Sequence, residues 1–311
     1  SVFPQNTAII HGNLRRSYAE FYARSRQLAS ALTQHYVGRG DTVSVMLANT
    51  PAMLECHYGV PMCQAVLHAI NTRLDAAVIA FQLDHAEAKI VIVDREFMPV
   101  MQDALERAAV KPLLIQYDDS QYEEPRIDSV ALDYDAFVTS GDSDFTWLMP
   151  RDEWDAISIN YTSGTTGNPK GVVYHHRGSY LMATGSAVAW DMPNKLNFLY
   201  TVPMFHCNGW CYPWTLAMLH ARVICIRNIR AKDIFYLIDK YKVTHFGGAP
   251  IILNMLASAP KEEQKKLKHK VYVLTAAAPP PSIIFKKMKN LGFEVMHVYG
   301  LTETYGHILQ C

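Results

Sequence analysis

The chain has 311 residues, of which 50% are hydrophobic and 19% are charged, a composition that supports a large buried core and excludes an intrinsically disordered protein. Its 29 basic side chains balance 29 acidic ones, so no overall field directs it to nucleic acid or to an anionic membrane surface. No apolar run reaches the ~20 residues of a membrane-spanning helix, because His220 and Arg222 interrupt the most apolar region.

The first part of the chain alternates between short β-branched runs and helical stretches. Ser17 and Glu20 place a hydroxyl three residues before a carboxylate, which predicts a capped amphipathic helix. The strand-helix-strand rhythm that follows predicts a parallel sheet with helices on both faces. Its strands are expected at residues 42–47, 66–70 and 89–94, with a helix over residues 51–64.

Between residues 117 and 155 this pattern weakens, and acidic side chains crowd a stretch that also contains Pro125. A solvated connector is the favoured interpretation, because a run of like charge usually faces water, and a cation site is the alternative. The connector ends a first predicted α/β domain, residues 1–150. A second predicted domain, residues 151–311, follows it.

In the second domain the alternation of strands and helices resumes, and no internal repeat of fixed short period is present. A glycine-rich run follows the first strand directly. The predicted strands are residues 156–161, 197–202, 222–226, 243–246, 271–276 and 294–299.

Six cysteines are scattered over the chain, at positions 56, 63, 207, 211, 225 and 311. A chain of this size does not depend on disulfides, so reduced thiols in a cytoplasm-like compartment are expected. A metal site at His206, Cys207 and Cys211 is disfavoured, because the segment lacks the second ligand pair of a structural zinc site. Small apolar side chains beside an aromatic wall are the preferred interpretation.

The glycine-rich run, from Tyr161 to Gly171, reads YTSGTTGNPKG. Its glycines leave consecutive backbone N–H groups unobstructed, its hydroxyls are further donors, and Lys170 adds a positive charge, so the run suits a bound phosphate. Pro169 fixes the direction in which the chain leaves the loop. The sequence therefore predicts an anion-binding loop between two strands.

Three other interpretations of this run fit less well. In the Gly-x-x-x-x-Gly-Lys-Ser/Thr loop of kinase-like NTPases, the second glycine would fall on Pro169 and the metal-binding hydroxyl on Gly171. A dinucleotide-binding Gly-x-Gly-x-x-Gly does not follow any of the predicted strands. A flexible polar turn would not explain the Asn-Pro-Lys-Gly tail.

Two segments resemble the signature sequences of a single family. Thr162–Gly171 is similar to the phosphate loop of the adenylate-forming (AMP-binding) superfamily, and Tyr299–Glu303 (YGLTE) is similar to its second signature. Ser17–Glu20 and Asn71–Asp75 extend the similarity. The resemblance implies an α/β fold with two doubly wound sheet subdomains, as in the large N-terminal domain of that superfamily. The small C-terminal domain would lie outside this chain.

The same resemblance implies ATP and CoA as substrates, Mg²⁺ as the metal, and four catalytic residues. Lys170 would neutralise the β- and γ-phosphates, Thr302 would contact the α-phosphate, and Glu303 would bind Mg²⁺, with helix capping as the structural alternative. His206 would lie near the substrate carboxylate, although a lone histidine among aromatic residues is often a core residue. The implied phosphate-binding residues are Thr162, Ser163, Gly164, Thr165, Thr166, Gly167 and Lys170.

The resemblance also implies where the adenine and the acid bind. Many relatives carry glycine where this chain has alanine, so close contact between the base and the backbone of Ala277 is less assured. The implied adenine-binding residues are Ala276, Ala277, Ala278, Pro279 and Tyr299. The implied acyl-binding residues are His206, Trp210, Gly247 and Gly248.

These segments are most similar to the acyl-CoA synthetase and fatty-acid–CoA ligase branch, which implies ligation of a short- to medium-chain acid to CoA. A non-catalytic nucleotide-binding module and an adenylation unit that loads a carrier protein are the alternatives. The ribose-binding aspartate, the hinge and the late lysine of the family would lie beyond Cys311, so the chain is expected to be a fragment. The partners expected are small molecules and not nucleic acid, and a homo-oligomer is left open.

Overall fold

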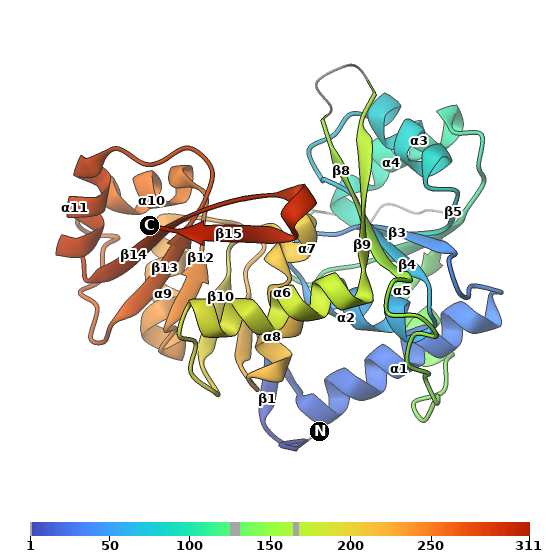
Figure 1. Ribbon diagram of the computed structural model, residues 1–311, viewed down its shortest axis with the longest axis horizontal. Coiled ribbons are helices and arrows are strands. Elements are labelled where there is room, and N and C mark those ends of the chain that lie inside the picture. The colour runs from blue at the N-terminus through green and yellow to red at the C-terminus, as the bar shows by residue number, and fades with distance from the viewer. Residues whose placement is uncertain (1, 125–130, 164–167) are drawn as a thin grey trace.

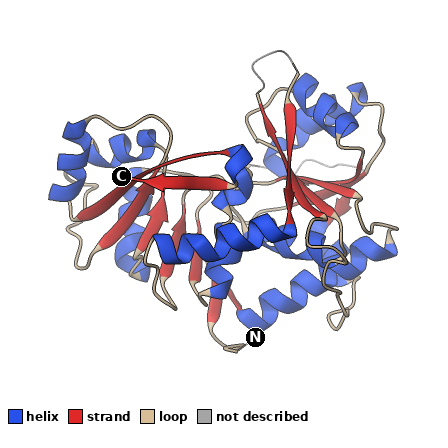
Figure 2. Cartoon of the chain, in the orientation of Figure 1, coloured by secondary structure: helices blue, strands red, loops and turns tan. Residues whose placement is uncertain are grey.

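The structure is a computed structural model that describes residues 2–124, 131–163 and 168–311. Its described strands form two mainly parallel sheets that lie side by side, each flanked by helices (Figures 1 and 2). Within those ranges, every helix is too short or too polar to span a lipid bilayer. All six cysteines are free thiols.

The first sheet has seven strands in the order β7-β6-β5-β3-β4-β8-β9. Its neighbours pair in parallel, except that β8 and β9 form an antiparallel hairpin at one edge. Central strands such as β3 are buried along their whole length, as parallel strands covered on both faces must be. The strands are β3 (Thr42–Met46), β4 (Val66–Ala69), β5 (Ala88–Asp94), β6 (Leu113–Tyr117), β7 (Leu132–Asp133), β8 (Ala156–Thr162) and β9 (Lys170–His175).

The second sheet has eight strands in the order β15-β14-β13-β12-β10-β11-β1-β2. An antiparallel hairpin lies at each edge, β14–β15 at one and β1–β2 at the other, and all the other neighbouring strands pair in parallel. The strands are β1 (Thr7–His11), β2 (Leu14–Ser17), β10 (Asn197–Tyr200), β11 (Arg222–Cys225), β12 (His245–Gly247), β13 (Val271–Thr275), β14 (Phe293–Leu301) and β15 (Gly306–Gln310).

Helices connect most of the parallel strands and cover the sheets. The predicted cap of the first helix is confirmed, because the Ser17 hydroxyl accepts from the Glu20 amide while the Glu20 carboxylate accepts from the Ser17 amide. The helices are α1 (Tyr18–Gln34), α2 (Pro51–Met62), α3 (Ala76–His85), η1 (Arg95–Phe97), α4 (Met98–Arg107), α5 (Tyr134–Thr139), α6 (His176–Ala189), α7 (Cys207–Trp210), α8 (Tyr212–Met218), α9 (Ala231–Tyr241), α10 (Pro250–Ala257), α11 (Ser282–Asn290) and η2 (Thr302–Thr304).

The division between the sheets does not follow the predicted domain boundary near residue 150. The N-terminal strand β1 pairs with β11, with Ile9 opposite Val223, and so belongs to the sheet built mostly from the second half of the chain. In the same way β8 pairs with β4 of the first half, with Leu67 opposite Ser158. A single apolar core consequently includes buried residues of both halves.

The acidic stretch is only partly the solvated connector that its composition predicted. It contains α5, and Asp119 within it is 1% exposed. The Asp119 carboxylate accepts hydrogen bonds from His11 Nε2 (2.9 Å) and Arg227 (2.8 Å), and Arg227 also forms a bidentate pair with Asp94. These ion pairs join the last residue of β5 and the segment after β6 in one sheet to the segment after β11 in the other, so they hold the two sheets together.

Candidate active site

The predicted phosphate loop joins the two strands of an antiparallel hairpin. Thr162 at the end of β8 lies opposite Lys170 at the start of β9. The side chains of Ser163 and Lys170 are both exposed, so they are available to a ligand. Four of the predicted phosphate-binding residues, Gly164, Thr165, Thr166 and Gly167, lie outside the described residues.

The second signature forms the end of β14 and the turn η2. Thr302 is held in place by a hydrogen bond from the Tyr174 hydroxyl to its carbonyl (2.6 Å) and by a contact from Cys207 Sγ to its own hydroxyl (3.4 Å). Thr304 caps this turn, because its Oγ1 accepts from the Leu301 amide at 2.9 Å. Thr304, and not Glu303, therefore caps this turn. The Glu303 carboxylate is exposed and is available to a cation.

Two cavities, each of about 290 Å³, adjoin these segments, and His206, Cys207 and Thr302 line both of them. We call the first the loop cavity, which is lined by residues that follow β4, by the end of β8 and by Pro169. We call the second the alanine cavity, which is lined by Ala249, Ala276 and Ala277 together with Trp210 and others. Thr162, Ser163 and Pro169 of the predicted phosphate loop thus line one cavity, and the mostly apolar second cavity lies on the other side of His206, Cys207 and Thr302.

The structure brings many, but not all, of the predicted site residues to these cavities. Thr162, Ser163, His206 and Thr302 line the loop cavity, and His206, Trp210, Ala276, Ala277 and Thr302 line the alanine cavity. The predicted catalytic residues Lys170 and Glu303 lie outside the linings of both, as do Ala278, Pro279 and the half-exposed Tyr299. Gly247 and Gly248 are buried, and a side chain on either would meet Val202 or Ile252 rather than open space.

His206 stands where the two cavities meet, directly before α7. Although the residue is exposed, the protein that surrounds its ring displaces water and lowers the pKa of the imidazole. A lowered pKa keeps the ring neutral near pH 7. A neutral imidazole can donate one hydrogen bond to a carboxylate and accept another without requiring a counter-ion.

The segment that follows His206 has an unusual backbone. Five consecutive residues, Cys207 to Cys211, have positive φ angles between 50° and 61°, so they form one turn of left-handed helix. Such a turn costs L-residues roughly 1–2 kcal/mol each. Backbone strain of this kind is typical of functional sites. The Asn208-Gly209 pair is the one sequence signal for it, because both residue types tolerate this conformation.

Buried hydrogen bonds stabilise this left-handed turn. The carboxamide oxygen of Asn208, which is 0% exposed, accepts from Ser158 Oγ and from Asn160 Nδ2, both at 2.7 Å. Ser158 and Asn160 lie on β8, the strand that leads into the phosphate loop. The Tyr200 hydroxyl also donates to the Gly209 carbonyl at 2.9 Å. The wall of the alanine cavity is thereby fixed to the strand that carries the loop, a connection that the sequence motifs did not reveal.

Ala277 also adopts a left-handed conformation, with φ +72°. Its carbonyl lies 3.2 Å from His297 Nε2. The conformation favours glycine, which agrees with the family pattern from which this chain departs. Ala277 is exposed, so its side chain needs no space in the core, and the strain at this position is that of its own backbone.

Across the described part of the chain, no three His, Cys, Asp or Glu side chains converge closely enough to hold a metal ion. The disfavoured zinc site at His206, Cys207 and Cys211 and the alternative of a cation site in the acidic stretch therefore find no support there. Glu303 fits Mg²⁺ in a different way, because that ion is usually bound by one or two carboxylates and completes its shell with water and substrate phosphates.

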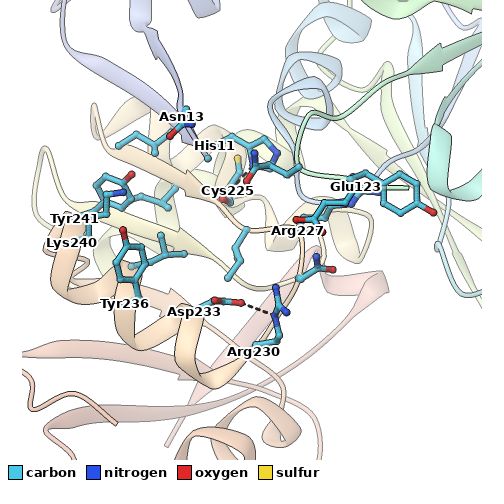
Figure 3. A pocket seen from close by; sticks show the side chains of 18 of the residues that line it. His11, Asn13, Glu123, Cys225, Arg227, Arg230, Asp233, Tyr236, Lys240 and Tyr241 are labelled. Carbon is cyan, nitrogen blue, oxygen red and sulfur yellow. Dashed lines mark hydrogen bonds and ion pairs between the residues drawn. The ribbon is translucent and has the colours of Figure 1, made fainter. Parts of the chain in front are cut away.

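A further cavity, of about 510 Å³, lies beside β1, β11 and α9 (Figure 3). Its wall includes His11, Cys225 and the ion pair between Arg230 and Asp233 (2.7 Å). Its described lining contains no residue of the predicted phosphate, adenine or acyl segments. The candidate site is therefore the pair of cavities that meet at His206.

The chain is similar to several plant CoA ligases. The family described as AMP-binding enzyme matches residues 1–311. The peroxisomal acetate/butyrate–CoA ligase of Arabidopsis thaliana is 45% identical over 323 aligned positions, covering 100% of this chain and 57% of that protein. The 2-methylpropanoate–CoA ligase of Humulus lupulus is 39% identical, again over 100% of this chain and 57% of its own length. The chain thus spans little more than half the length of these relatives.

Solved structures share the fold. The inhibitor-bound N-terminal domain of FACL13 from Mycobacterium tuberculosis superposes with a TM-score of 0.87 at 28% identity, covering 99% of this chain and 75% of that one. The anthranilate–CoA ligase AuaEII in complex with anthranoyl-AMP gives a TM-score of 0.87 at 19% identity, covering 99% and 59%, which is evidence of fold alone. These likenesses confirm the predicted α/β fold with two sheet units.

Proposed function

The chain belongs to the AMP-binding enzyme family, and from this premise we propose that its parent protein is an ATP-dependent acid–CoA ligase. The observation that carries the proposal is the shared wall of the two cavities. His206, Cys207 and Thr302 line both, so the phosphate loop and the mostly apolar pocket meet at one place. A carboxylate in the alanine cavity would lie beside phosphates held at the loop.

The proposed reaction has two steps. A carboxylate oxygen attacks the α-phosphorus of ATP, which forms an acyl-adenylate and releases pyrophosphate. The thiol of CoA then attacks the acyl carbon, loses its proton and displaces AMP. The first step joins two anions, so positive charge and hydrogen-bond donors must offset their repulsion.

We assign Lys170 and the loop amides to the β- and γ-phosphates and Thr302 to the α-phosphate. Neutral His206 donates a hydrogen bond to the carboxylate and orients it. Bound Mg²⁺ would supply Lewis-acid charge on the phosphate oxygens, and Glu303 is the residue that would hold it. The adenine would lie along Ala276, Ala277, Ala278 and Pro279, with Tyr299 nearby.

We propose that the acid is short- to medium-chain. The alanine cavity has a volume of about 290 Å³, and its lining residues Trp210 and Ala249 are free to contact an acyl chain, whereas Ala276 and Ala277 are assigned to the adenine. Gly247 and Gly248, which the resemblance assigns to acyl binding, lie behind this lining, and a Cβ on Gly247 would meet Val202, which lines the cavity. The relatives named for acetate, butyrate and 2-methylpropanoate support small acids. Apolar contacts discriminate only about 10- to 200-fold per methylene, so several acids should serve as substrates.

Free thiols agree with a reducing compartment, and the cytoplasm is the location we propose for the parent. A relative described as peroxisomal makes the peroxisome the competing location. Imaging of the tagged full-length protein distinguishes the two.

Acid-dependent exchange of labelled pyrophosphate into ATP tests the enzyme assignment. The full-length protein should catalyse it with at least one acid from a panel of two to eight carbons. Absence of exchange with every acid would favour a non-catalytic nucleotide-binding module. If exchange occurs but CoA gives no thioester, the alternative of an adenylation unit that loads a carrier protein is favoured.

A further inference from the structure

His307 on β15 is an imidazole in the alanine cavity that neither sequence signature includes. It pairs in the sheet with Gly300 of β14 and lines the cavity together with Thr302 and Trp210. The residue is only 7% exposed. Its Nδ1 atom is buried and has no hydrogen-bond partner. A buried polar atom without a partner is uncommon and calls for an explanation.

The surroundings of the ring determine where its proton lies. Burial lowers the pKa of His307, so the ring is neutral and carries one N–H. A buried N–H without an acceptor is less tolerated than a lone pair without a donor. The proton therefore belongs on Nε2 and not on the enclosed Nδ1. The ring consequently has one hydrogen-bond donor, the Nε2–H group. His307 lines the alanine cavity, so a ligand bound there is the candidate acceptor.

On the basis of the proposed function, we propose that His307 is a substrate-binding residue whose Nε2–H donates a hydrogen bond to an oxygen of the bound acid. The partner is an uncharged ether, carbonyl or hydroxyl oxygen on the acyl chain, or an oxygen of the carboxylate itself. Both sources share the same acceptor chemistry. Every acid has a carboxylate oxygen, whereas only substituted acids have an oxygen on the acyl chain. The two acceptors therefore differ in which acids gain binding free energy from His307.

The variant that removes the donor is His307→Leu, and His307→Gln keeps a neutral N–H. Leucine has a similar size, and it replaces a polar group that lacks a partner in the free protein. We therefore expect His307→Leu to fold with an unfolding midpoint no lower than that of the wild type. Ile308→Ala is the matched control for strand β15, because Ile308 is the neighbouring residue and is 56% exposed.

Two pairs of acids of nearly equal shape separate the possible acceptors. Methoxyacetate replaces one methylene of butyrate with an oxygen, and 3-methoxypropanoate does the same for pentanoate. We measure kcat/KM for each acid in pyrophosphate exchange with the full-length protein. A chain acceptor predicts that the wild type favours one ether acid over its alkyl partner about tenfold or more, since a site built to hydrogen-bond an oxygen rejects the analogue without it.

If the acceptor is an oxygen on the acyl chain, His307→Leu abolishes the preference for the ether acid over its alkyl partner, and His307→Gln retains that preference. A carboxylate acceptor instead predicts that His307→Leu lowers kcat/KM for all four acids by a similar factor of about three- to tenfold, while the KM for ATP is unchanged. The inference is overturned if His307→Leu leaves all four values within twofold, or if Ile308→Ala has the same effect. Failure of the wild type to exchange with any acid would instead refute the proposed function.

Discussion

At the scale of single residues, Ala277 is the clearest case in which this chain carries a residue that its backbone does not favour. Its φ of +72° is reached freely only by glycine. We predict that Ala277→Gly raises the free energy of unfolding by about 1 kcal/mol. Urea denaturation measures the change. Ala278→Gly, one residue further on at an ordinary φ, should instead lower it by about 0.4–1 kcal/mol.

Lys170 and Glu303 are assigned to charge stabilisation and are exposed in the free protein. We predict that Lys170→Ala and Glu303→Ala each lower pyrophosphate exchange by on the order of 100-fold or more, because each removes charge placed at the phosphates. Exposed side chains contribute little to folding, so the free energy of unfolding should change by less than about 0.5 kcal/mol. If each variant lost exchange activity only in proportion to the fraction of protein that it left unfolded, these residues would be structural.

Sequence motifs identified some of the candidate site residues and missed others for a physical reason. Thr302 and Glu303 belong to a continuous signature, so their role could be inferred by resemblance. Asn208 and His307 act through neighbours that are distant in the chain. The environment of Asn208 depends on Ser158, which is 50 residues away, and a single sequence does not reveal that contact.

At the scale of secondary-structure elements, the left-handed turn from Cys207 to Cys211 holds the wall between the cavities. Asn208 supplies both a tolerant backbone and a buried amide. We predict that Asn208→Gly destabilises the protein by about 1–3 kcal/mol, because the Ser158 and Asn160 donors lose their acceptor. Asn208→Ala should lose roughly 1 kcal/mol more, since alanine also opposes the positive φ.

Urea denaturation of the two Asn208 variants provides this comparison. Ser25→Ala is a suitable control, because it removes a different buried polar group, a hydroxyl that donates to the Phe21 carbonyl within α1. If Asn208→Ala proved as stable as Asn208→Gly, the left-handed backbone would not be a source of strain at this position.

The sequence pattern predicted most of the parallel strands, with the exceptions of β1 and β6, and it did not predict the edge strands β2, β7 and β15. Thr42–Leu47 was expected as a strand and β3 is Thr42–Met46, because its apolar run reflects burial on both faces. The edge strand β2 has the sequence Leu-Arg-Arg-Ser and no buried residue, so it carries no comparable signal. Its pairing with β1 is a property of the hairpin rather than of its own composition.

At the scale of the whole molecule, the ion-pair cluster around Arg227 joins the two sheets. Burial alone would raise the pKa of Asp119, but hydrogen bonds from His11, the Gln121 amide and Arg227 hold it below its ordinary value of 3.8. A depressed pKa contributes stability that is present above pH ~4 and is lost as the pH falls through the lower folded-state pKa. The wild type should therefore be more stable than Asp119→Asn at pH 7.

This stability difference should shrink when the pH is lowered from 4 toward 2, which denaturation at a series of pH values would measure. Asp144→Asn is the control, because the Asp144 side chain is 86% exposed and forms one ion pair with Arg26. Its effect should be below about 1 kcal/mol at each pH. An Asp119→Asn difference that does not vary with pH would contradict the assigned linkage.

The way in which the chain is divided between the two sheets could not have been predicted from local pattern. β1 and β8 each lie in the sheet formed mainly by the other half of the chain. Short strands carry little information about which partner they pair with, and the partner is selected by packing across the common core. The pairing of β8 with β4 places Thr162, at the end of β8, in the loop cavity that His206 and Thr302 also line.

If the two cavities serve carboxylate adenylation, one oxygen atom of the acid is transferred to AMP. The full-length protein is given ATP, CoA and its preferred acid with both carboxylate oxygens labelled with ¹⁸O. Attack of the carboxylate on the α-phosphorus predicts that each AMP released carries one ¹⁸O. Unlabelled AMP, with the ¹⁸O found in orthophosphate or pyrophosphate, would contradict adenylation and place the attack at another phosphorus.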